Sequence, residues 1–289
     1  MKLATTTEDF RKYYNDDISK VKELARAGFK NIDLSLFYNE VEYYLDSDWK
    51  TKVRELKKVA DDLGVKFVQM HSTALFEGGI KDENYDYGIK STIRSIEICK
   101  ELEIPFTVVH GADNPNVTNF EQKLELNLEF YKNFFSVMED TGVMVLSENS
   151  PKRKRLDWWQ PIYTGEQAKQ LCEYINHPLF GFCWDTGHAN MQGAQYQHIL
   201  DLGKHLKAVH YNDNDGVNDL HVIPFTQTLN NDEVISALVK IGFNGPLTFE
   251  CSNGVSPKEL VPIEVARQNA KLLYQTGKAL LTKYNIFEE

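Results

Sequence analysis

The feature that most constrains the fold of this chain is a recurring pattern: a short apolar run that ends in a histidine or a carboxylate. The six run-ending residues are His71, His110, Glu148, Asp185, His210 and Glu250. Successive members are separated by 39, 38, 37, 25 and 40 residues. A strand, a helix and their two loops occupy roughly that length, about 30 residues or more. The recurrence therefore predicts a chain built from repeated β/α units.

Local sequence signals supply the elements of these units. The predicted strands cover residues 2–7, 31–36, 65–70, 105–109, 143–147, 180–184, 206–209 and 247–249. The predicted helices cover about 18–27, 48–63, 86–102, 118–142, a segment opening at 164, 195–202, 232–241 and 258–284. Strands that alternate with helices imply a parallel sheet.

Helix-capping residues mark several of the predicted boundaries. Asp16 or Asp17 can cap the first helix, and Gly28 suits its C-terminal end. Capping boxes are predicted at 118–121 and 164–167, and Asn231 can cap the helix that follows it.

Eight β/α repeats predict an α/β fold closed into a (β/α)8 TIM barrel. The 289 residues fit one such barrel, and no linker or low-complexity tract divides the chain, so we expect a single domain over 1–289. A doubly wound open sheet is the alternative architecture. It would normally use fewer strands, and the sequence contains neither a G-x-G-x-x-G turn nor a P-loop.

Composition limits the classes of partner and the compartment. A net charge of −10 disfavours non-specific binding to nucleic acid or anionic membranes. The four cysteines, at 99, 172, 183 and 251, form no C-x-x-C pair, which favours free thiols in a reducing compartment. No run reaches 18 apolar residues, and the first residues lack an apolar signal-peptide core. We therefore expect a cytoplasmic protein with neither a signal peptide nor a membrane span.

The residues that precede each run-ending residue predict the interior of the barrel. Because side chains alternate along a strand, the inward neighbours lie two and four positions earlier. They are mostly apolar: Gln69 and Phe67, Val108 and Phe106, Leu146 and Met144, Cys183 and Gly181, and Ala208 and Leu206. The pattern predicts an apolar interior below a ring of ionisable groups at the C-terminal rim, which carries the active site in TIM barrels.

A divalent metal ion is the simplest explanation for that ring. A single histidine at a strand end is more often a hydrogen-bonded structural residue. Six imidazoles or carboxylates that converge in one cavity would instead be costly to bury without a compensating charge. Oxygen and nitrogen ligands suit Mn²⁺, Mg²⁺, Co²⁺, Fe²⁺ or Zn²⁺. Cys183 should lie one layer too deep to ligate, and Cys251 should point away from the interior.

Five short segments carry a family resemblance: Glu148-Asn149, Asp185-Thr186-Gly187-His188, His210-Tyr211-Asn212-Asp213, Asp219-Leu220-His221 and Glu250. In this order and spacing, over essentially the whole chain, they resemble the xylose isomerase-like TIM barrels. That family includes sugar-phosphate isomerases and epimerases, ketose 3-epimerase-like enzymes and endonuclease IV-type AP endonucleases. The resemblance implies a metal held by Glu148, Asp185, His210 and Glu250, with His188 in contact with substrate.

The nuclease branch of this family uses a three-metal cluster. The additional ligands that the resemblance implies for it are His71, His110, His188, Asp219 and His221, and all are present. The R-x-D-R-H-x-x-I-G-x-G segment typical of that branch is replaced by V-N-D-L-H-V-I-P-F at 217–225. The P-G-x-G element common in the sugar branch is also altered, because Pro224 is followed by F-T-Q. We therefore do not expect nucleic acid as a partner, and the subgroup stays open.

The mechanism implied by the resemblance is proton transfer on an α-hydroxy carbonyl of a sugar or sugar phosphate through an enediolate. Glu148 and Glu250 would form the acid/base pair, and His188 would donate to the developing oxyanion. We expect Gly187 to let the chain turn, so that His188 faces the same cavity. A hydride shift, an AP endonuclease-like phosphodiesterase and a polyol or inosose dehydratase-like lyase remain alternatives.

The basic segment 151–159, P-K-R-K-R-L-D-W-W, follows Glu148. As a lid it could hold a phosphate or carboxylate through Arg153 or Arg155 and stack a sugar on Trp158. A solvated loop or a subunit contact is the more common role for such a run, which leaves a homo-oligomer open.

Overall fold

The computed structural model describes residues 1–289 except 39, 74–83, 115, 152–160, 258 and 289. The strands are β1 (Lys2–Thr6), β2 (Asn31–Ser35), β3 (Lys66–His71), β4 (Phe106–Val108), β5 (Met144–Glu148), β6 (Phe180–Asp185), β7 (Leu206–Tyr211) and β8 (Pro246–Phe249). The α-helices are α1 (Asp17–Ala27), α2 (Trp49–Asp62), α3 (Tyr85–Glu101), α4 (Phe120–Lys132), α5 (Phe135–Thr141), α6 (Gly165–Ile175), α7 (Thr186–Asn190), α8 (Tyr196–Leu202), α9 (Asn231–Lys240), α10 (Ser252–Val255) and α11 (Ile263–Lys283). Short 3₁₀ helices are η1 (Thr7–Phe10), η2 (Glu40–Tyr44) and η3 (Gly203–His205).

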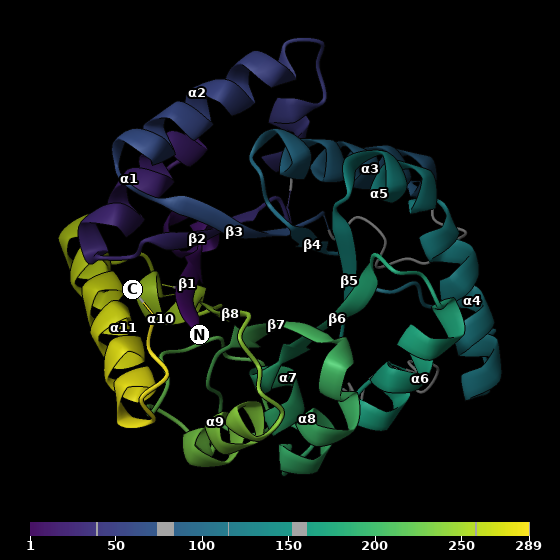
Figure 1. The fold of residues 1–289 in the computed structure, drawn as a ribbon. Helices are drawn as coiled ribbons and strands as arrows, with labels where there is room; N and C mark the ends of the chain where they lie inside the picture. The colour runs from purple at the N-terminus through teal and green to yellow at the C-terminus, as the bar shows by residue number, and fades with distance from the viewer. Residues whose placement is uncertain (39, 74–83, 115, 152–160, 258, 289) are drawn as a thin grey trace.

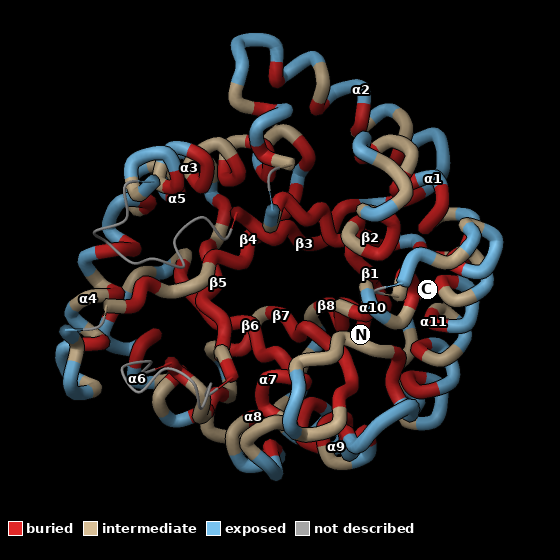
Figure 2. Tube along the Cα trace, turned by 180° about the vertical axis from the view of Figure 1, so that it is seen from behind, coloured by how far each residue is buried: buried red, intermediate tan, exposed pale blue. Residues whose placement is uncertain are grey.

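The eight strands form one closed parallel barrel in sequence order, and the longer helices surround it (Figure 1). Closure is made by the pairing of β1 with β8, in which Leu3 lies opposite Leu247. The predicted (β/α)8 TIM barrel is confirmed, and the open doubly wound sheet is excluded. Figure 2 shows the strands as a buried ring, with exposed residues on the outer sides of the helices.

Capping residues position the helices largely as their chemistry predicts. The Asp16 carboxylate accepts a hydrogen bond from the Ser19 backbone at 2.7 Å. A complete capping box forms between Thr164 and Gln167. Two predicted caps are wrong by one residue, because Asn119 and not Thr118 caps α4, and Asn230 and not Asn231 caps α9.

The predicted helix over 118–142 is in fact two helices, α4 and α5. The Asn133 side-chain amide donates to the Phe130 carbonyl at 2.8 Å, and the Asn133 and Phe134 backbone amides bond three residues back instead of four. A side-chain hydrogen bond to a backbone carbonyl competes with the backbone hydrogen bond that a continuous α-helix would make to that carbonyl. The final helix also starts later than predicted, at Ile263, because Pro262 is extended and forms its N-terminal boundary.

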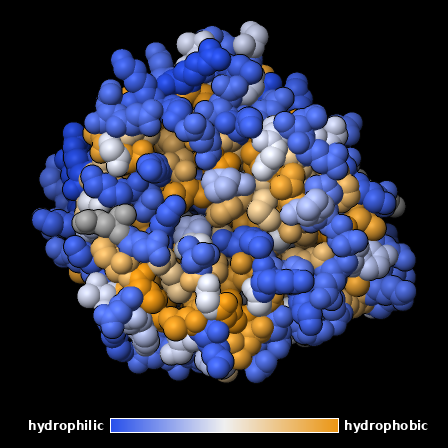
Figure 3. Space-filling view, viewed as in Figure 1, coloured by the Kyte–Doolittle hydropathy of each residue, from blue (hydrophilic) through white to orange (hydrophobic). Residues whose placement is uncertain are grey.

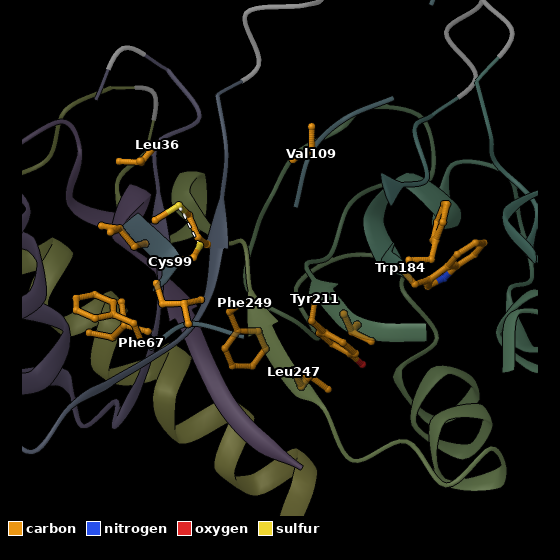
Figure 4. Packing of buried hydrophobic residues seen from close by; sticks show 14 of the residues in the cluster. Leu36, Phe67, Cys99, Val109, Trp184, Tyr211, Leu247 and Phe249 are labelled. Atoms are coloured by element: carbon orange, nitrogen blue, oxygen red, sulfur yellow. Dashed lines mark hydrogen bonds between the residues drawn. The ribbon is translucent and has the colours of Figure 1, made fainter. Parts of the chain in front are cut away.

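Two separate apolar layers hold the barrel together. The larger layer lies between the sheet and the helices, and Figure 4 shows part of it, including Trp184, Tyr211 and Phe249. The surface of the face seen in Figure 3 is largely hydrophilic around its periphery, as expected when the helices turn their apolar sides inward. The smaller layer fills part of the barrel interior and consists of Phe106, Val108, Leu146, Cys183 and Ala208, with Met144 packed against it.

The barrel interior is apolar on one side only. Most of the predicted inward residues of β4 to β7 form the apolar layer just described, whereas Leu206 belongs to the larger outer layer. On β2, β3 and β8 the interior carries Asp33, Gln69 and Thr248, all fully buried. The Gln69 side chain contacts both of the others, with Nε2 3.2 Å from Asp33 Oδ1 and Oε1 3.4 Å from Thr248 Oγ1. The expected apolar interior is therefore correct for half of the barrel, and the other half is polar.

The two ends of the chain meet beside β1 (Figure 1). The Met1 amino group donates to the Ile286 carbonyl at 2.6 Å, and Lys2 pairs with Glu288. Among the described residues, none of the helices has the length and apolar content that a bilayer crossing requires.

Candidate metal centre

Four side chains from the ends of β5, β6, β7 and β8 converge at one end of the barrel. They are Glu148, Asp185, His210 and Glu250, and one ligand atom of each lies within 4.8 Å of the others. His210 Nδ1 is 3.1 Å from Glu148 Oε1 and 3.2 Å from Glu250 Oε1. Three of the side chains are at most 2% exposed, and Glu250 is 13% exposed. The structure thus brings together the four residues that the sequence singled out as metal ligands.

Strand register explains why these four meet. In a parallel barrel the C-terminal ends of all strands lie at the same end of the barrel. Asp185 on β6 pairs directly with His210 on β7 after a register shift between Phe182 and Cys183. The shift inserts an irregularity below the site, and such bulges re-aim side chains.

Three neighbouring residues hold Asp185 by hydrogen bonds. Its Oδ1 accepts from the His188 backbone at 2.6 Å and caps α7, while Oδ2 accepts from Asn212 Nδ2 at 2.8 Å. The Asn149 amide bonds both backbone groups of Asp185, at 2.7 and 2.9 Å. These bonds fix the orientation of the carboxylate.

Gly187 has a different role from the one expected. It lies inside α7 and is not among the glycines with positive φ, so no special turn depends on it. A Cβ at this position would instead lie 1.9 Å from Asn212 Oδ1. The glycine is needed because Asn212 must pass close to α7 to reach Asp185.

A second cluster of potential ligands adjoins the first and consists of His188, Asp219 and His221. Asp219 bridges the two imidazoles, with Oδ2 3.3 Å from His188 Nε2 and Oδ1 3.1 Å from His221 Nε2. His188 Nδ1 is 2.7 Å from the Asn149 carbonyl and 3.6 Å from Glu148 Oε1. His221 has a left-handed backbone, with φ of 48°, which is uncommon for a non-glycine residue.

A third cluster consists of His71, His110 and Glu148. Glu148 Oε2 lies 3.5 Å from His71 Nε2 and 3.2 Å from His110 Nε2. The Phe37 ring covers both imidazoles, with centroids 4.9 Å from His71 and 5.5 Å from His110. Sequence reasoning missed Phe37, because nothing in its local pattern links the residues after β2 to those after β3 and β4.

The two glutamates at the centre have opposite electrostatic surroundings. Burial opposes ionisation of Glu148, but His210, His110 and His71 outweigh it and hold its pKa well below the usual range. Burial, followed by the charges of Glu148 and Asp185, raises the pKa of Glu250 well above its usual range. Neighbouring carboxyls with separated pKa values are typical of acid/base sites.

The donor set fits a divalent cation. Its members are carboxylate oxygens and imidazole nitrogens, which suit the divalent ions from Mg²⁺ to Zn²⁺. The cysteines are excluded as ligands. Cys183 belongs to the apolar layer inside the barrel, and Cys251 Sγ faces the carbonyl oxygens of Tyr211 and Val222. All four cysteines are buried and unpaired, as predicted.

The predicted lid lies outside the described residues. Arg153, Arg155 and Trp158 all fall within 152–160, so their proposed role in substrate binding stays a prediction.

Comparison with known proteins identifies the family of this chain. A sequence model of the family described as xylose isomerase-like TIM barrel matches residues 21–276. The chain belongs to this family. The resemblance noted in the five short segments is therefore confirmed at the level of the family.

Curated relatives match parts of the chain. An uncharacterised protein of Methanocaldococcus jannaschii is 27% identical over 175 residues, which cover 58% of each chain. A ketose 3-epimerase of Arthrobacter globiformis is 31% identical over 90 residues, or 31% of this chain and 29% of the relative. A probable endonuclease 4 of Persephonella marina is 24% identical over 194 residues, or 60% and 66%. The matches thus span less than two thirds of each relative.

Solved structures resemble the whole fold. A D-tagatose 3-epimerase-like protein superposes with a TM-score of 0.75 at 20% identity, covering 98% of this chain and 100% of the other. The D-psicose 3-epimerase of Clostridium cellulolyticum H10 superposes with a TM-score of 0.76 at 16% identity, covering 97% and 99%. At these identities the likeness establishes the architecture.

Proposed function

We propose that this protein is a divalent-metal-dependent isomerase or epimerase of a sugar or sugar phosphate, acting by proton transfer at the carbon next to a carbonyl. The observation that carries the proposal is the buried group of Glu148, Asp185, His210 and Glu250, in which two glutamates flank one imidazole at 3.1 and 3.2 Å. The match to a ketose 3-epimerase supports the same reaction class.

Such a reaction needs both a cation that stabilises negative charge and a base that removes a proton. A divalent cation held by the four residues would act as a Lewis acid and stabilise negative charge on the substrate oxygens. A carbon acid beside a carbonyl is very weak, and each unit of pKa mismatch costs about 1.4 kcal/mol. A base held in place beside that carbon is therefore needed as well.

Glu250 is the better placed of the two glutamates to exchange a proton with substrate. Its Oε1 faces His210, while its Oε2 is 3.9 Å from the nearest imidazole nitrogen of His221. Glu148 Oε2 is already engaged by His71 and His110 at 3.5 and 3.2 Å. We therefore assign proton removal or return on one face to Glu250. Glu148 serves the opposite face, where its ionised carboxylate can accept a proton, and the two histidines hold its Oε2.

His188 is suited to stabilise the developing oxyanion. Burial lowers the pKa of His188, but the charges of Asp185 and Asp219 outweigh it and raise that pKa well above the usual value. A protonated imidazole in this position can donate a hydrogen bond to a substrate oxygen.

The test is solvent-deuterium incorporation in a metal-supplemented screen of ketoses, aldoses and inositol derivatives. Glu250→Gln should abolish incorporation at the reacting carbon, because the amide cannot accept the proton. Glu55→Gln, at an exposed position on α2, is the matched control and should retain it. Undiminished incorporation in Glu250→Gln would refute the assigned role. A 2-keto product formed with loss of water would instead indicate a dehydratase.

A phosphodiesterase is the second candidate, and one observation favours it. The His188–Asp219–His221 and His71–His110–Glu148 clusters could each hold a further cation beside the first. A probable endonuclease 4 is among the relatives. The net charge of −10 opposes it, because a nuclease must attract a polyanion. Cleavage of a duplex that contains an abasic site would establish this activity, and its absence with Zn²⁺, Mn²⁺ and Mg²⁺ would exclude it.

A further inference from the structure

The polar half of the barrel interior makes direct contact with the candidate metal centre from below. His210 turns Nδ1 toward the two glutamates, and its opposite nitrogen, Nε2, lies 2.7 Å from Gln69 Nε2. Gln69 is fully buried on β3, and 141 residues separate it from His210 in the chain. The contact therefore crosses the barrel from β3 to β7.

Gln69 is itself held by side chains of two other strands. Its Nε2 is 3.2 Å from Asp33 Oδ1 on β2, and its Oε1 is 3.4 Å from Thr248 Oγ1 on β8. Asp33 is fully buried, and among the described residues its Oδ2 has no hydrogen-bond partner. Asp33, Gln69 and His210 thus form a chain of contacts in which every member is removed from solvent.

The protonation of an imidazole determines which nitrogen can bind a cation. A neutral imidazole has one nitrogen that carries a proton and one with a free lone pair. If Nδ1 of His210 binds a cation, Nε2 must carry the proton and needs an acceptor in the buried interior. Gln69 can provide one, because its amide can rotate by half a turn and exchange Oε1 for Nε2 in the same space.

We infer that Gln69, oriented by Asp33, is a positioning residue that makes Nδ1 of His210 the cation-binding atom. In the cation-bound state Gln69 Oε1 accepts from His210 Nε2–H. The same oxygen then faces Asp33, whose carboxyl must donate to it. The inference rests on the metal site of the proposed function and extends it to the residues beneath the site.

The surroundings of Asp33 are compatible with a carboxyl that donates. Burial raises the pKa of Asp33, which opposes the lowering effect of His210 and His71. An asparagine at this position would donate through its amide in the same way, whereas a leucine would not.

The experiment measures Mn²⁺ affinity by competition with a chelator at fixed pH, for the wild-type protein and four variants. Gln69→Leu and Asp33→Leu should weaken binding by about 10- to 100-fold, the usual effect of losing a partner of a ligating histidine. Asp33→Asn should stay within about threefold of the wild type. Val108→Ala, in the apolar half of the interior, is the control for a packing defect and should leave affinity unchanged.

A second measurement needs no substitution at Gln69. In the ¹⁵N spectrum of the Zn²⁺-loaded wild-type protein, the His210 signals are those that disappear in the His210→Ala variant. They should show a protonated Nε2 and a metal-bound Nδ1. Metal bound through Nε2, or wild-type affinity in Gln69→Leu, would overturn the inference while leaving the proposed function intact. Equal losses of Mn²⁺ affinity in Asp33→Asn and Asp33→Leu would show that Asp33 acts through its charge. That result would overturn the hydrogen-bonding role inferred for Asp33. A wild-type protein that binds no divalent cation would contradict both proposals.

Discussion

Single carboxyls in this protein behave differently according to what surrounds them. The imidazoles around Glu148 outweigh its burial and lower its pKa, whereas burial, together with the charges of Glu148 and Asp185, raises the pKa of Glu250. Asp9 is a third case, away from the metal centre. It is fully buried in η1, where Oδ2 accepts from Thr5 Oγ1 at 2.6 Å and Oδ1 has no partner among the described residues.

Asp9 should make the stability of the protein fall as pH rises. Burial raises the pKa of Asp9 to about 8, from 3.8 for an ordinary aspartate. Between those values the folded state keeps a proton that the unfolded state has lost. Unfolding then releases a proton, and the free energy of unfolding decreases by up to about 1.4 kcal/mol per pH unit. Asp9→Asn should remove this contribution, since it cannot ionise and can still accept from Thr5.

The measurement is urea denaturation of the wild-type protein and Asp9→Asn at pH 5, 6, 7 and 8, with chelator present. The difference in free energy of unfolding should grow in favour of the variant as pH increases. Asp16→Asn, at an exposed helix cap, is the control. If the free energies of unfolding of the two proteins differ by the same amount at every pH in this range, Asp9 is ionised in the folded protein.

At the scale of elements, the site depends on how closely short segments approach one another. Helix α7 begins at Thr186, is capped by Asp185, and passes beside the residues that follow β7. This approach leaves no room for a side chain at Gly187, where a Cβ would lie 1.9 Å from Asn212 Oδ1. The bond from Asn212 Nδ2 to Asp185 Oδ2 depends on this space.

Gly187→Ala should therefore weaken metal binding through the displacement of Asn212. We expect a loss of about 10- to 100-fold in Mn²⁺ affinity, the range typical for the partners of metal ligands. Met191→Ala, at the end of the same helix, is the control and should bind as the wild type does. Chelator competition gives the affinities, and circular dichroism confirms that both variants are folded. Unchanged affinity in a folded Gly187→Ala protein would mean that Asp185 does not need Asn212.

At the scale of the whole molecule, the barrel brings several acidic groups into one buried region. Glu148, Asp185 and Glu250 come from three strands, and their mutual repulsion acts only in the folded state. Binding of a cation to the folded state alone stabilises it by about 2.7 kcal/mol at a concentration 100 times Kd.

Divalent metal should consequently raise the melting temperature by several degrees over that of the chelator-treated protein. A change of 1 kcal/mol shifts the midpoint by roughly 2–4 °C in domains of about 150–250 residues, and by somewhat less in longer chains. Differential scanning calorimetry with Mn²⁺, Zn²⁺ and Mg²⁺ in turn gives the shift and ranks the metals. In Asp185→Asn the shift should shrink, because one ligand loses its charge. Equal melting temperatures with metal and with chelator would argue against the metal centre.

The sequence by itself determined the architecture and indicated the candidate site. Recurrence of strand and helix patterns along the chain predicts the barrel, and residues at the ends of parallel strands must meet at one rim. For that reason local patterns could name six run-ending residues, and the family resemblance then selected Glu148, Asp185, His210 and Glu250 among them as expected metal ligands. Helix boundaries were less predictable, because competition such as that of Asn133 for a backbone carbonyl depends on individual side-chain bonds.

Only the tertiary structure decided which residues support that rim. Gln69 reaches His210 across the barrel, Phe37 covers His71 and His110, and Asn212 requires Gly187 to be small. These contacts join residues on different strands and loops, and their geometry depends on strand register and on the curvature that closes the sheet. A linear pattern records which side of a strand a residue faces, but it does not record what lies opposite that residue inside a closed barrel.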